Sequence, residues 1–125
     1  MKNANYYTLT PYKHHYFEDN GGYVTDEFKN FAKKWKNFLT RMCENRGWTL
    51  EKFNVGHYYC SWFIKNGEKY VYCSFSDVRW GSKSWYKLIL HRIAKDDNDY
   101  TGGHNWYTEL ENLEEAIQRR FQQGY

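Results

Sequence analysis

The longest regular pattern of apolar and polar positions follows Thr25. Apolar residues recur there in steps of three and four, which is the spacing of one face of an α-helix. They are Phe28, Phe31, Ala32, Trp35, Phe38, Leu39, Met42 and Cys43. Thr25 is a good N-cap, and Asp26 and Glu27 suit the positive end of a helix dipole. Gly47 after Arg46 suits a C-terminal stop. The pattern predicts a helix with one buried face.

Two β-rich runs flank Asn66-Gly67 and predict a hairpin. Asn-Gly is the strongest short hairpin signal, because both central residues of a type I′ turn take a positive φ. A two-residue turn at this dipeptide fixes the register and places Phe63 opposite Tyr70. It also makes Cys60 and Cys73 direct neighbours.

Alternation along these two strands sorts their side chains onto two faces of a sheet. The better core face, on which the helix stripe should pack, holds Tyr58, Cys60, Trp62, Ile64, Val71, Cys73 and Phe75. The other face mixes rings with hydroxyl groups, as a half-solvated surface does, and holds His57, Tyr59, Ser61, Phe63, Tyr70, Tyr72 and Ser74. This second face is similar to platforms on which bases stack. A covered second core face or a protein interface fits it at least as well.

The remaining patterns predict three more strands and a second helix. The strands are expected at Tyr6–Tyr12, at Trp85–Ala94, whose centre is too apolar for a sheet edge, and, as a short strand, at Asn105–Glu109. The last helix starts at Asn112 with Glu115 completing a capping box. Its buried residues are expected to be Leu113, Ala116, Ile117 and Phe121.

The element order β-α-β-β-β-α predicts an α+β fold, with an antiparallel sheet of about four strands and two helices packed on one face. The length of 125 residues suits one domain, 1–125. We find no apolar run of membrane-spanning length and no secretory signal, so we expect a cytoplasmic protein without a membrane partner. The three cysteines should then be reduced.

Composition adds an excess of aromatic residues. Rings make up 22% of the chain, which is more than one core of this size needs, so some should lie on a surface or at an interface. Charge is unevenly distributed. Residues 65–95 carry seven basic and two acidic side chains, whereas residues 96–115 carry seven acidic and no basic ones. Such asymmetry steers charged partners, or is simply a bipolar solvated surface.

Enzyme signatures are missing from the sequence. It contains no HExxH, Walker loop, GxSxG or GxGxxG motif. His57 and Cys60 fall on opposite faces of the predicted strand, which argues against a nucleophile pair. The loop that starts at Asp97 faintly resembles a calcium loop, but Thr108 stands where the bidentate Glu is needed. We therefore expect no metal, no cofactor and no catalytic residue.

The segment from Tyr100 to Asn105 is the better binding candidate. Its paired glycines let backbone N–H groups approach an anion, and Arg92 and Lys95 come just before it. A plain glycine turn between two strands explains the same residues. The candidate ligand- or partner-binding residues are Arg79, Arg92, Tyr100, Thr101, Gly102, Gly103, Asn105, Tyr59, Tyr70 and Tyr72.

Three stretches carry a resemblance to known sequences. They are Ser76-Asp77-Val78-Arg79, Leu90-His91-Arg92-Ile93-Ala94-Lys95, and Asp99-Tyr100-Thr101-Gly102-Gly103 with Asn105. Together they resemble uncharacterised small proteins of phages and mobile elements of low-GC Gram-positive bacteria. The resemblance covers roughly residues 57–117. It implies no catalytic residue, but many such proteins block host defences, as anti-CRISPR proteins do.

We therefore expect a non-enzymatic binding protein that inhibits a host defence component such as a Cas effector, by aromatic hot spots and a charged face. The alternative is a nucleotide or nucleic-acid binder with an aromatic and basic surface. A third possibility is an enzyme with a site at His57, Asp77 or Arg79.

Overall fold

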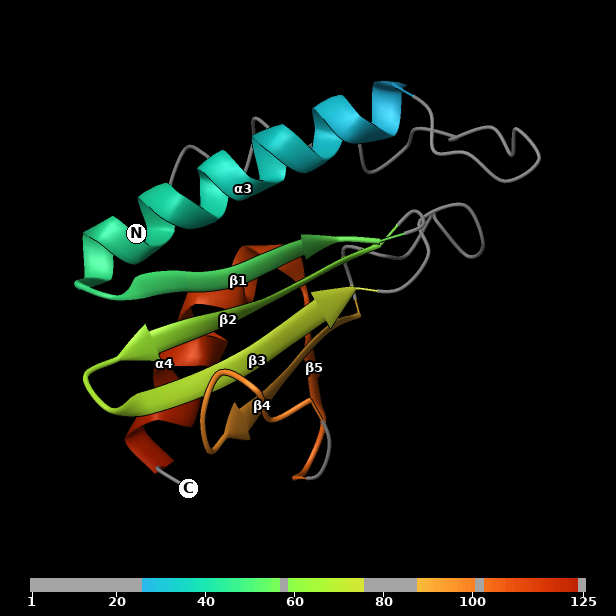
Figure 1. Ribbon diagram of the computed structural model, residues 1–125. Coiled ribbons are helices and arrows are strands. Elements are labelled where there is room, and N and C mark those ends of the chain that lie inside the picture. Colours follow the sequence, from blue (N-terminus) through green and yellow to red (C-terminus); the bar gives the residue numbers. More distant parts are fainter. Residues whose placement is uncertain (1–25, 57–58, 76–87, 101–102, 124–125) are drawn as a thin grey trace.

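The computed structural model describes residues 26–56, 59–75, 88–100 and 103–123 (Figure 1). Its elements, in chain order, are helix α3 (Asp26–Arg46), strands β1 (Thr49–Val55), β2 (Cys60–Asn66), β3 (Lys69–Phe75), β4 (Ile89–Ala94) and β5 (Trp106–Thr108), the 3₁₀ turn η2 (Leu110–Asn112) and helix α4 (Leu113–Gln123). The strand expected at Tyr6–Tyr12 and the N-cap Thr25 lie outside the described residues.

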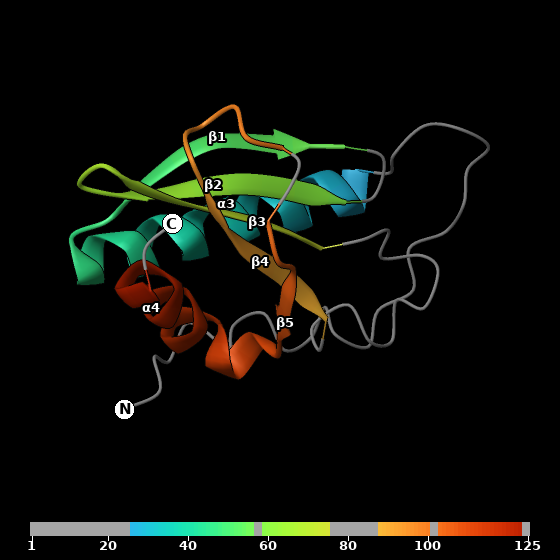
Figure 2. The same cartoon turned by 90° about the horizontal axis from the view of Figure 1, so that it is seen from below.

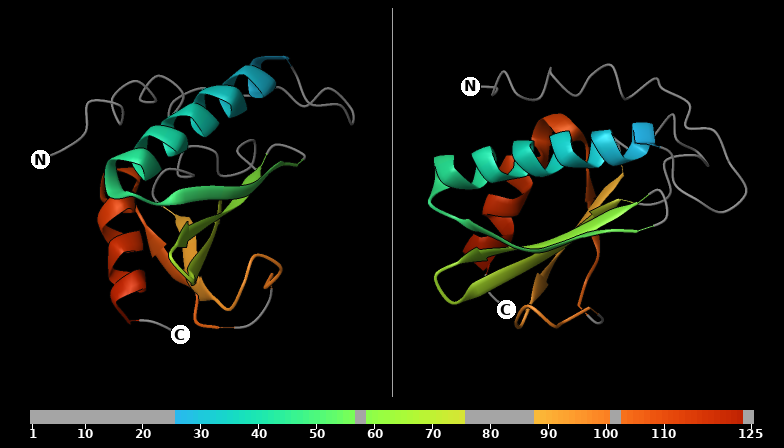
Figure 3. Two further views of the ribbon diagram at one scale, coloured as in Figure 1. Left: turned by 60° about the vertical axis from the view of Figure 1, so that its left-hand side comes forward. Right: turned by 45° about the horizontal axis from the view of Figure 1, so that its top comes forward.

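The five described strands form one antiparallel sheet in the order β1-β2-β3-β4-β5, so every strand pairs with its neighbour in the chain. Helices α3 and α4 lie on the same side of this sheet, as Figure 2 and Figure 3 show from different directions. One hydrophobic cluster joins α3, the first four strands, η2 and α4. The predicted α+β class is confirmed, but the sheet has five described strands where about four were expected.

Helix α3 follows the predicted stripe. All eight of its apolar residues are buried, and the helix ends at Arg46, just before Gly47. Trp35 lies at the centre of the core, with its ring 5.5 Å from that of Trp62 and 5.6 Å from that of Phe75. Both contacts are edge-to-face, the arrangement that ring quadrupoles favour. The better core face was therefore identified correctly from alternation.

The hairpin turn lies one residue further along the chain than expected, so each β2 residue pairs with a β3 residue two positions later than predicted. Asn66 pairs with Lys69, so the turn is Gly67-Glu68 rather than Asn66-Gly67. Gly67 has a φ of +64°, and Glu68 is not among the residues with positive φ. This suits a type II′ turn, which needs glycine only at its first central position. Phe63 consequently lies opposite Tyr72, not Tyr70.

The shift by two residues keeps each side chain on its predicted face, because strand side chains alternate with a period of two. It does change the direct neighbours. Cys60 lies opposite Phe75, and Cys73 lies opposite Trp62, so the expected Cys60–Cys73 pair is wrong. All three cysteines are buried and free.

Strand β1 was not predicted, and a β-bulge explains why. Leu50 and Phe53 both pack against the core, although strict alternation places residues three apart on opposite faces. The register shifts by one residue between Glu51 and Asn54, and Lys52 there has a φ of +45°. The extra residue returns Phe53 to the core side.

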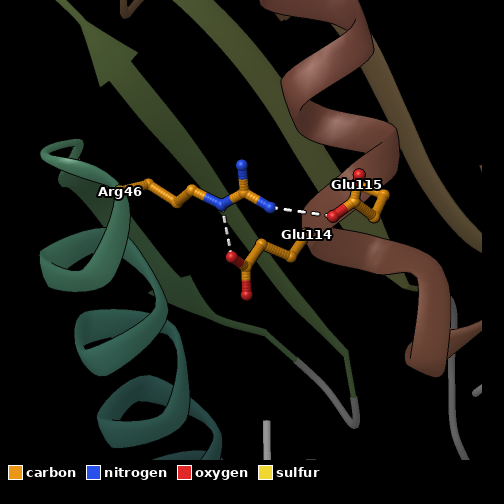
Figure 4. A network of polar contacts seen from close by, with 3 residues as sticks. All are labelled: Arg46, Glu114 and Glu115. Atoms are coloured by element: carbon orange, nitrogen blue, oxygen red, sulfur yellow. Dashed lines mark hydrogen bonds and ion pairs between the residues drawn. The ribbon is translucent and has the colours of Figure 1, made fainter. Parts of the chain in front are cut away.

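The C-terminal helix starts one residue later than predicted. Leu113 begins α4 after the η2 turn, and Ala116 is only half-buried. Glu115, expected in a capping box, instead accepts a hydrogen bond from Arg46 Nη2 at 2.9 Å. Arg46 Nε also donates to Glu114 Oε2, so one guanidinium at the end of α3 links both carboxylates at the start of α4 (Figure 4).

Candidate binding site on the tyrosine face

The face of the sheet that the helices leave uncovered carries most of the described tyrosines. Residues directly opposite each other on paired strands point to the same face. Phe63 lies opposite Tyr72, Ser74 lies opposite Leu90, and Leu90 lies opposite Tyr107. We call this surface the tyrosine face and define it by Tyr70, Tyr72, Tyr100 and Tyr107.

The loop between β4 and β5 crosses this face. Asn98 and Asp97 reach Lys52 on β1, the opposite edge of the sheet, where Lys52 Nζ donates to Asn98 Oδ1 at 2.6 Å and lies 3.6 Å from Asp97 Oδ1. In Figure 2 the loop runs in front of the strands, on the side away from α3. The loop covers part of the face that alternation predicted to be half-solvated.

Tyr100 is the part of the loop that packs down on the sheet. Its ring centroid lies 5.2 Å from that of Phe63 and 5.8 Å from that of Tyr72. Phe63 and Tyr72 are themselves 5.1 Å apart. Phe63 is fully buried beneath the other rings, whereas 45% of Tyr100 is exposed. The three rings form a packed cluster with one edge in solvent.

Arg92 borders this ring cluster on β4. Its guanidinium lies 4.5 Å from the Tyr72 ring centroid, and its Nη1 donates to Asn105 Oδ1 at 3.3 Å. The side chain is buried, and its Nε and Nη2 atoms have no hydrogen-bond partner among the described residues. A Cβ on Gly103, whose φ is +79°, would lie 3.8 Å from Arg92 Cδ. The loop can therefore return close beside this arginine.

The loop aspartates are engaged in local structure. Asp99 Oδ2 accepts a hydrogen bond from the backbone N–H of Lys95 at 3.0 Å, and Asp96 Oδ1 accepts one from that of Asn98 at 2.8 Å. Within the described ranges, no group of three or more His, Cys, Asp or Glu side chains is placed to bind a metal ion.

The structure brings half of the predicted site residues together. Arg92, Tyr72, Tyr100, Gly103 and Asn105 form one neighbourhood around the ring cluster. The others lie apart or cannot be placed. Tyr70 is half-buried next to Lys65, whose Nζ is 5.7 Å from its ring centroid, and Tyr59 lies at the β1–β2 turn with its ring against Gly56. Arg79, Thr101 and Gly102 lie outside the described residues, as do His57 and Asp77.

Sequence reasoning missed three residues of this surface. Phe63 was placed on the correct face, but its full burial was not predicted. It is buried by Tyr100 of the crossing loop, which is distant from it in the chain. Lys52, the loop anchor, lies in the unpredicted strand β1. Tyr107 is 58% exposed, and its place in the short predicted strand was the one signal that could have identified it.

The described thiols are poorly suited to nucleophilic chemistry. Burial raises the pKa of Cys43 and of Cys60 to about 12, and it raises the pKa of Cys73 well above its usual value. The thiolate is the nucleophilic form, so these side chains are unreactive in the folded state.

Comparisons with known proteins give no relative: the chain matches no model of a protein family, no curated protein and no solved structure. In the part of the chain that the structure describes, neither helix combines the length and the apolar character needed to cross a membrane.

Proposed function

We propose that this protein is a non-enzymatic binding protein that covers the surface of a protein partner with its tyrosine face. The observation that carries the proposal is the exposure of two tyrosines on this one face, Tyr100 and Tyr107, with a third exposed tyrosine, Tyr59, at the β1–β2 turn. Tyr59 is 43% exposed, Tyr100 is 45% exposed and Tyr107 is 58% exposed. Tyrosine is enriched among the residues that contribute most to protein–protein affinity.

The packing beneath these rings favours binding further. Tyr100 is fixed by its contacts with Phe63 and Tyr72, and the loop that carries it is attached to β1 through Lys52. A surface that is already ordered loses little conformational entropy when a partner binds. Tyrosine itself supplies a large contact area for only two side-chain torsions.

The class of partner follows from the sequence resemblance. Small proteins of phages and mobile elements often inhibit host defences, and we propose the same role here, with a Cas effector or another defence protein as the target. Exposed charged side chains around the face would set the orientation of such a partner.

The test measures inhibition of purified defence nucleases, beginning with a Cas9-type effector, by the full-length protein. We expect DNA cleavage to fall as the protein is added, and Tyr107→Ala to raise the half-inhibitory concentration by roughly 10-fold or more, as a hot-spot residue does. Val55→Ala is the matched control, because Val55 is also exposed, at 48%, but lines a groove with lysines of α3.

Two results would contradict the proposal. One is the failure of the protein to bind or inhibit any defence effector from bacteria that host such phages. The other is equal inhibition by the wild type and by Tyr107→Ala, which would leave the tyrosine face without a role.

Arg92 favours a second candidate function, the binding of a nucleotide or nucleic acid. Its guanidinium lies beside Tyr72, and its buried Nε and Nη2, which have no hydrogen-bond partner among the described residues, form a donor pair of the kind that phosphate oxygens accept. This function predicts oligonucleotide binding that weakens steeply with salt. Fluorescence anisotropy with labelled single-stranded DNA measures it. Binding that is lost in Arg92→Lys would favour this candidate, and the absence of binding at low salt would eliminate it.

A further inference from the structure

A cavity lies where the β2–β3 turn, the end of β4 and the C-terminal turn of α4 meet. Its volume is about 240 Å³. Its lining residues are Glu68, Lys69, Tyr70, Ile93, Ala94, Lys95, Arg120 and Phe121. Three of these side chains are cationic and one is acidic, so the cavity is positively charged.

Arg120 is the unusual member of this lining. Only 7% of the residue is exposed, and its guanidinium carbon lies 3.8 Å from the centroid of the Trp106 ring. Its Nε and Nη1 atoms are buried without a hydrogen-bond partner. No carboxylate among the described residues forms an ion pair with it.

The contacts of the buried Arg120 guanidinium do not fully offset the free-energy cost of removing its charge and its N–H donors from water. Stacking on an indole ring offsets part of the cost of removing the charge from water. It leaves the N–H donors unsatisfied, and buried donors are rarely left so in folded proteins. Burial, together with the nearby charge of Arg119, lowers the pKa of Arg120, as expected for a cation that lacks an anion.

Lys69 adds a second cation at the same place. Its Nζ donates to the backbone oxygen of Phe121 at 2.9 Å, which fixes the ammonium group beside the end of α4. An ammonium has two further N–H donors for another acceptor. Arg120 and Lys69 therefore line one cavity from two different elements, α4 and β3.

We propose that this cavity binds a small oxyanion, a phosphate or carboxylate group, with Arg120 and Lys69 as its ligands. A guanidinium forms strong charge-assisted hydrogen bonds with such groups, and an anion beside Arg120 would give an acceptor to a donor that has none. The volume is below the usual range for a drug-sized ligand. The site therefore suits a free anion or the charged end of a larger molecule. It does not depend on the protein partner proposed above.

The experiment uses the full chain at low ionic strength and measures thermal unfolding and calorimetric binding with inorganic phosphate and, separately, succinate. Sodium chloride at equal ionic strength is the reference. We expect a rise in Tm with at least one of the two anions that exceeds the effect of chloride, because a ligand that binds the folded state stabilises it. A rise in Tm with phosphate only would identify a phosphate site, and a rise with succinate only would identify a carboxylate site. Either result supports the proposal.

Variants distinguish this pocket from general charge attraction. Arg120→Lys keeps the charge but loses the paired donors, so the affinity should fall at least ~10-fold. Arg119→Gln is the matched control, because Arg119 is the exposed neighbour on the same helix, and it should change the affinity less than ~2-fold. If Arg120→Lys does not fold, Lys69→Gln tests the same cavity and should also weaken binding.

Two outcomes would overturn the proposal. One is no response to either anion, beyond that to chloride, up to ~10 mM, since a site that weak would add almost no stability. The other is a loss of binding in Arg119→Gln as large as the loss in Arg120→Lys or Lys69→Gln, which would show that the anion responds only to net charge.

Discussion

His91 lies on β4 between the sheet and helix α4, and it is 3% exposed. Burial, followed by the positive charge of Arg120, lowers its pKa from 6.5 to about 4, and a hydrogen bond to the backbone of Ile89 partly opposes this shift. The folded protein therefore keeps this imidazole neutral at pH values where the unfolded chain would protonate it.

A pH dependence of stability follows at this residue. As the pH falls below 6.5, His91 becomes protonated in the unfolded chain. In the folded protein it stays neutral until the pH falls to about 4. The free energy of unfolding should therefore fall across this window, by about 3 kcal/mol in total for this group. Urea unfolding of the wild type and of His91→Gln at several pH values measures it.

The variant should show a smaller fall between neutral pH and about pH 4 than the wild type, since glutamine does not titrate. His104→Gln is the control, because His104 is exposed, and it should keep the full wild-type slope. Parallel pH profiles for the wild type and His91→Gln would show that His91 is not the group responsible.

At the scale of single elements, local patterns were sufficient for the helices and insufficient for strand pairing. The α3 stripe depends on neighbours three and four residues apart, so the sequence alone identified every buried position. The apolar pattern of strand β1 is interrupted by a bulge at Lys52, and the residue types there do not predict a bulge. The hairpin register depends on whether Asn66 or Gly67 begins the turn, and both choices keep the same faces.

The candidate site shows the same division. Arg92, Tyr100 and Asn105 were selected because they lie close together in the chain, and the structure brings them together. Phe63 and Lys52 belong to the same surface through contacts across 37 and 46 residues, respectively, with Tyr100 and Asn98. Such contacts have no short-range sequence signal.

The loop element predicts a measurable effect of Tyr100→Ala. The substitution removes the ring contacts with Phe63 and Tyr72 and uncovers the fully buried Phe63. We expect a loss of roughly 2 kcal/mol in the free energy of unfolding, from two aromatic contacts and the exposed apolar area. Chemical denaturation measures the loss, and increased binding of a hydrophobic dye reports the uncovered ring.

Tyr107→Ala serves as the comparison, because Tyr107 is more exposed than Tyr100 and no ring contact is found for it among the described residues. Its cost should stay within about 0.5 kcal/mol, as for most surface substitutions. Equal costs for both variants would show that Tyr100 does not fasten the loop.

At the scale of the whole molecule, part of the uneven charge seen in the sequence is used within the fold. The acidic run from residue 96 to residue 115 supplies Asp97 to Lys52, and it supplies Glu114 and Glu115 to Arg46. The run was expected to be either a steering field or a solvated surface. Three of its seven carboxylates connect segments that are distant in the chain.

Arg46 is the clearest test of this internal use. Arg46→Met removes the contacts with Glu114 and Glu115 that join α3 to α4, and it also removes the approach of the guanidinium to the Trp48 ring at 5.7 Å. We expect thermal unfolding to show a loss of about 1–2 kcal/mol, since Glu114 is partly buried and paired. The loss should shrink at high salt.

Arg41→Met is the control, since Arg41 is an exposed residue of the same helix. It should change the stability by less than about 0.5 kcal/mol. A comparable loss in Arg41→Met, or a loss in Arg46→Met that salt does not reduce, would attribute the effect to the helix itself rather than to the link between the helices.

The loop between β4 and β5, which Tyr100 and Asn98 hold across the sheet, has a practical consequence. A single protease cut among Asp96, Asp97 and Asn98 would break the chain between Tyr100 and the end of β4, and would weaken the loop's attachment to Lys52 and its cover over the buried Phe63. For the same reason, an engineered version of this chain with a shortened loop should gain from a smaller or polar residue in place of Phe63.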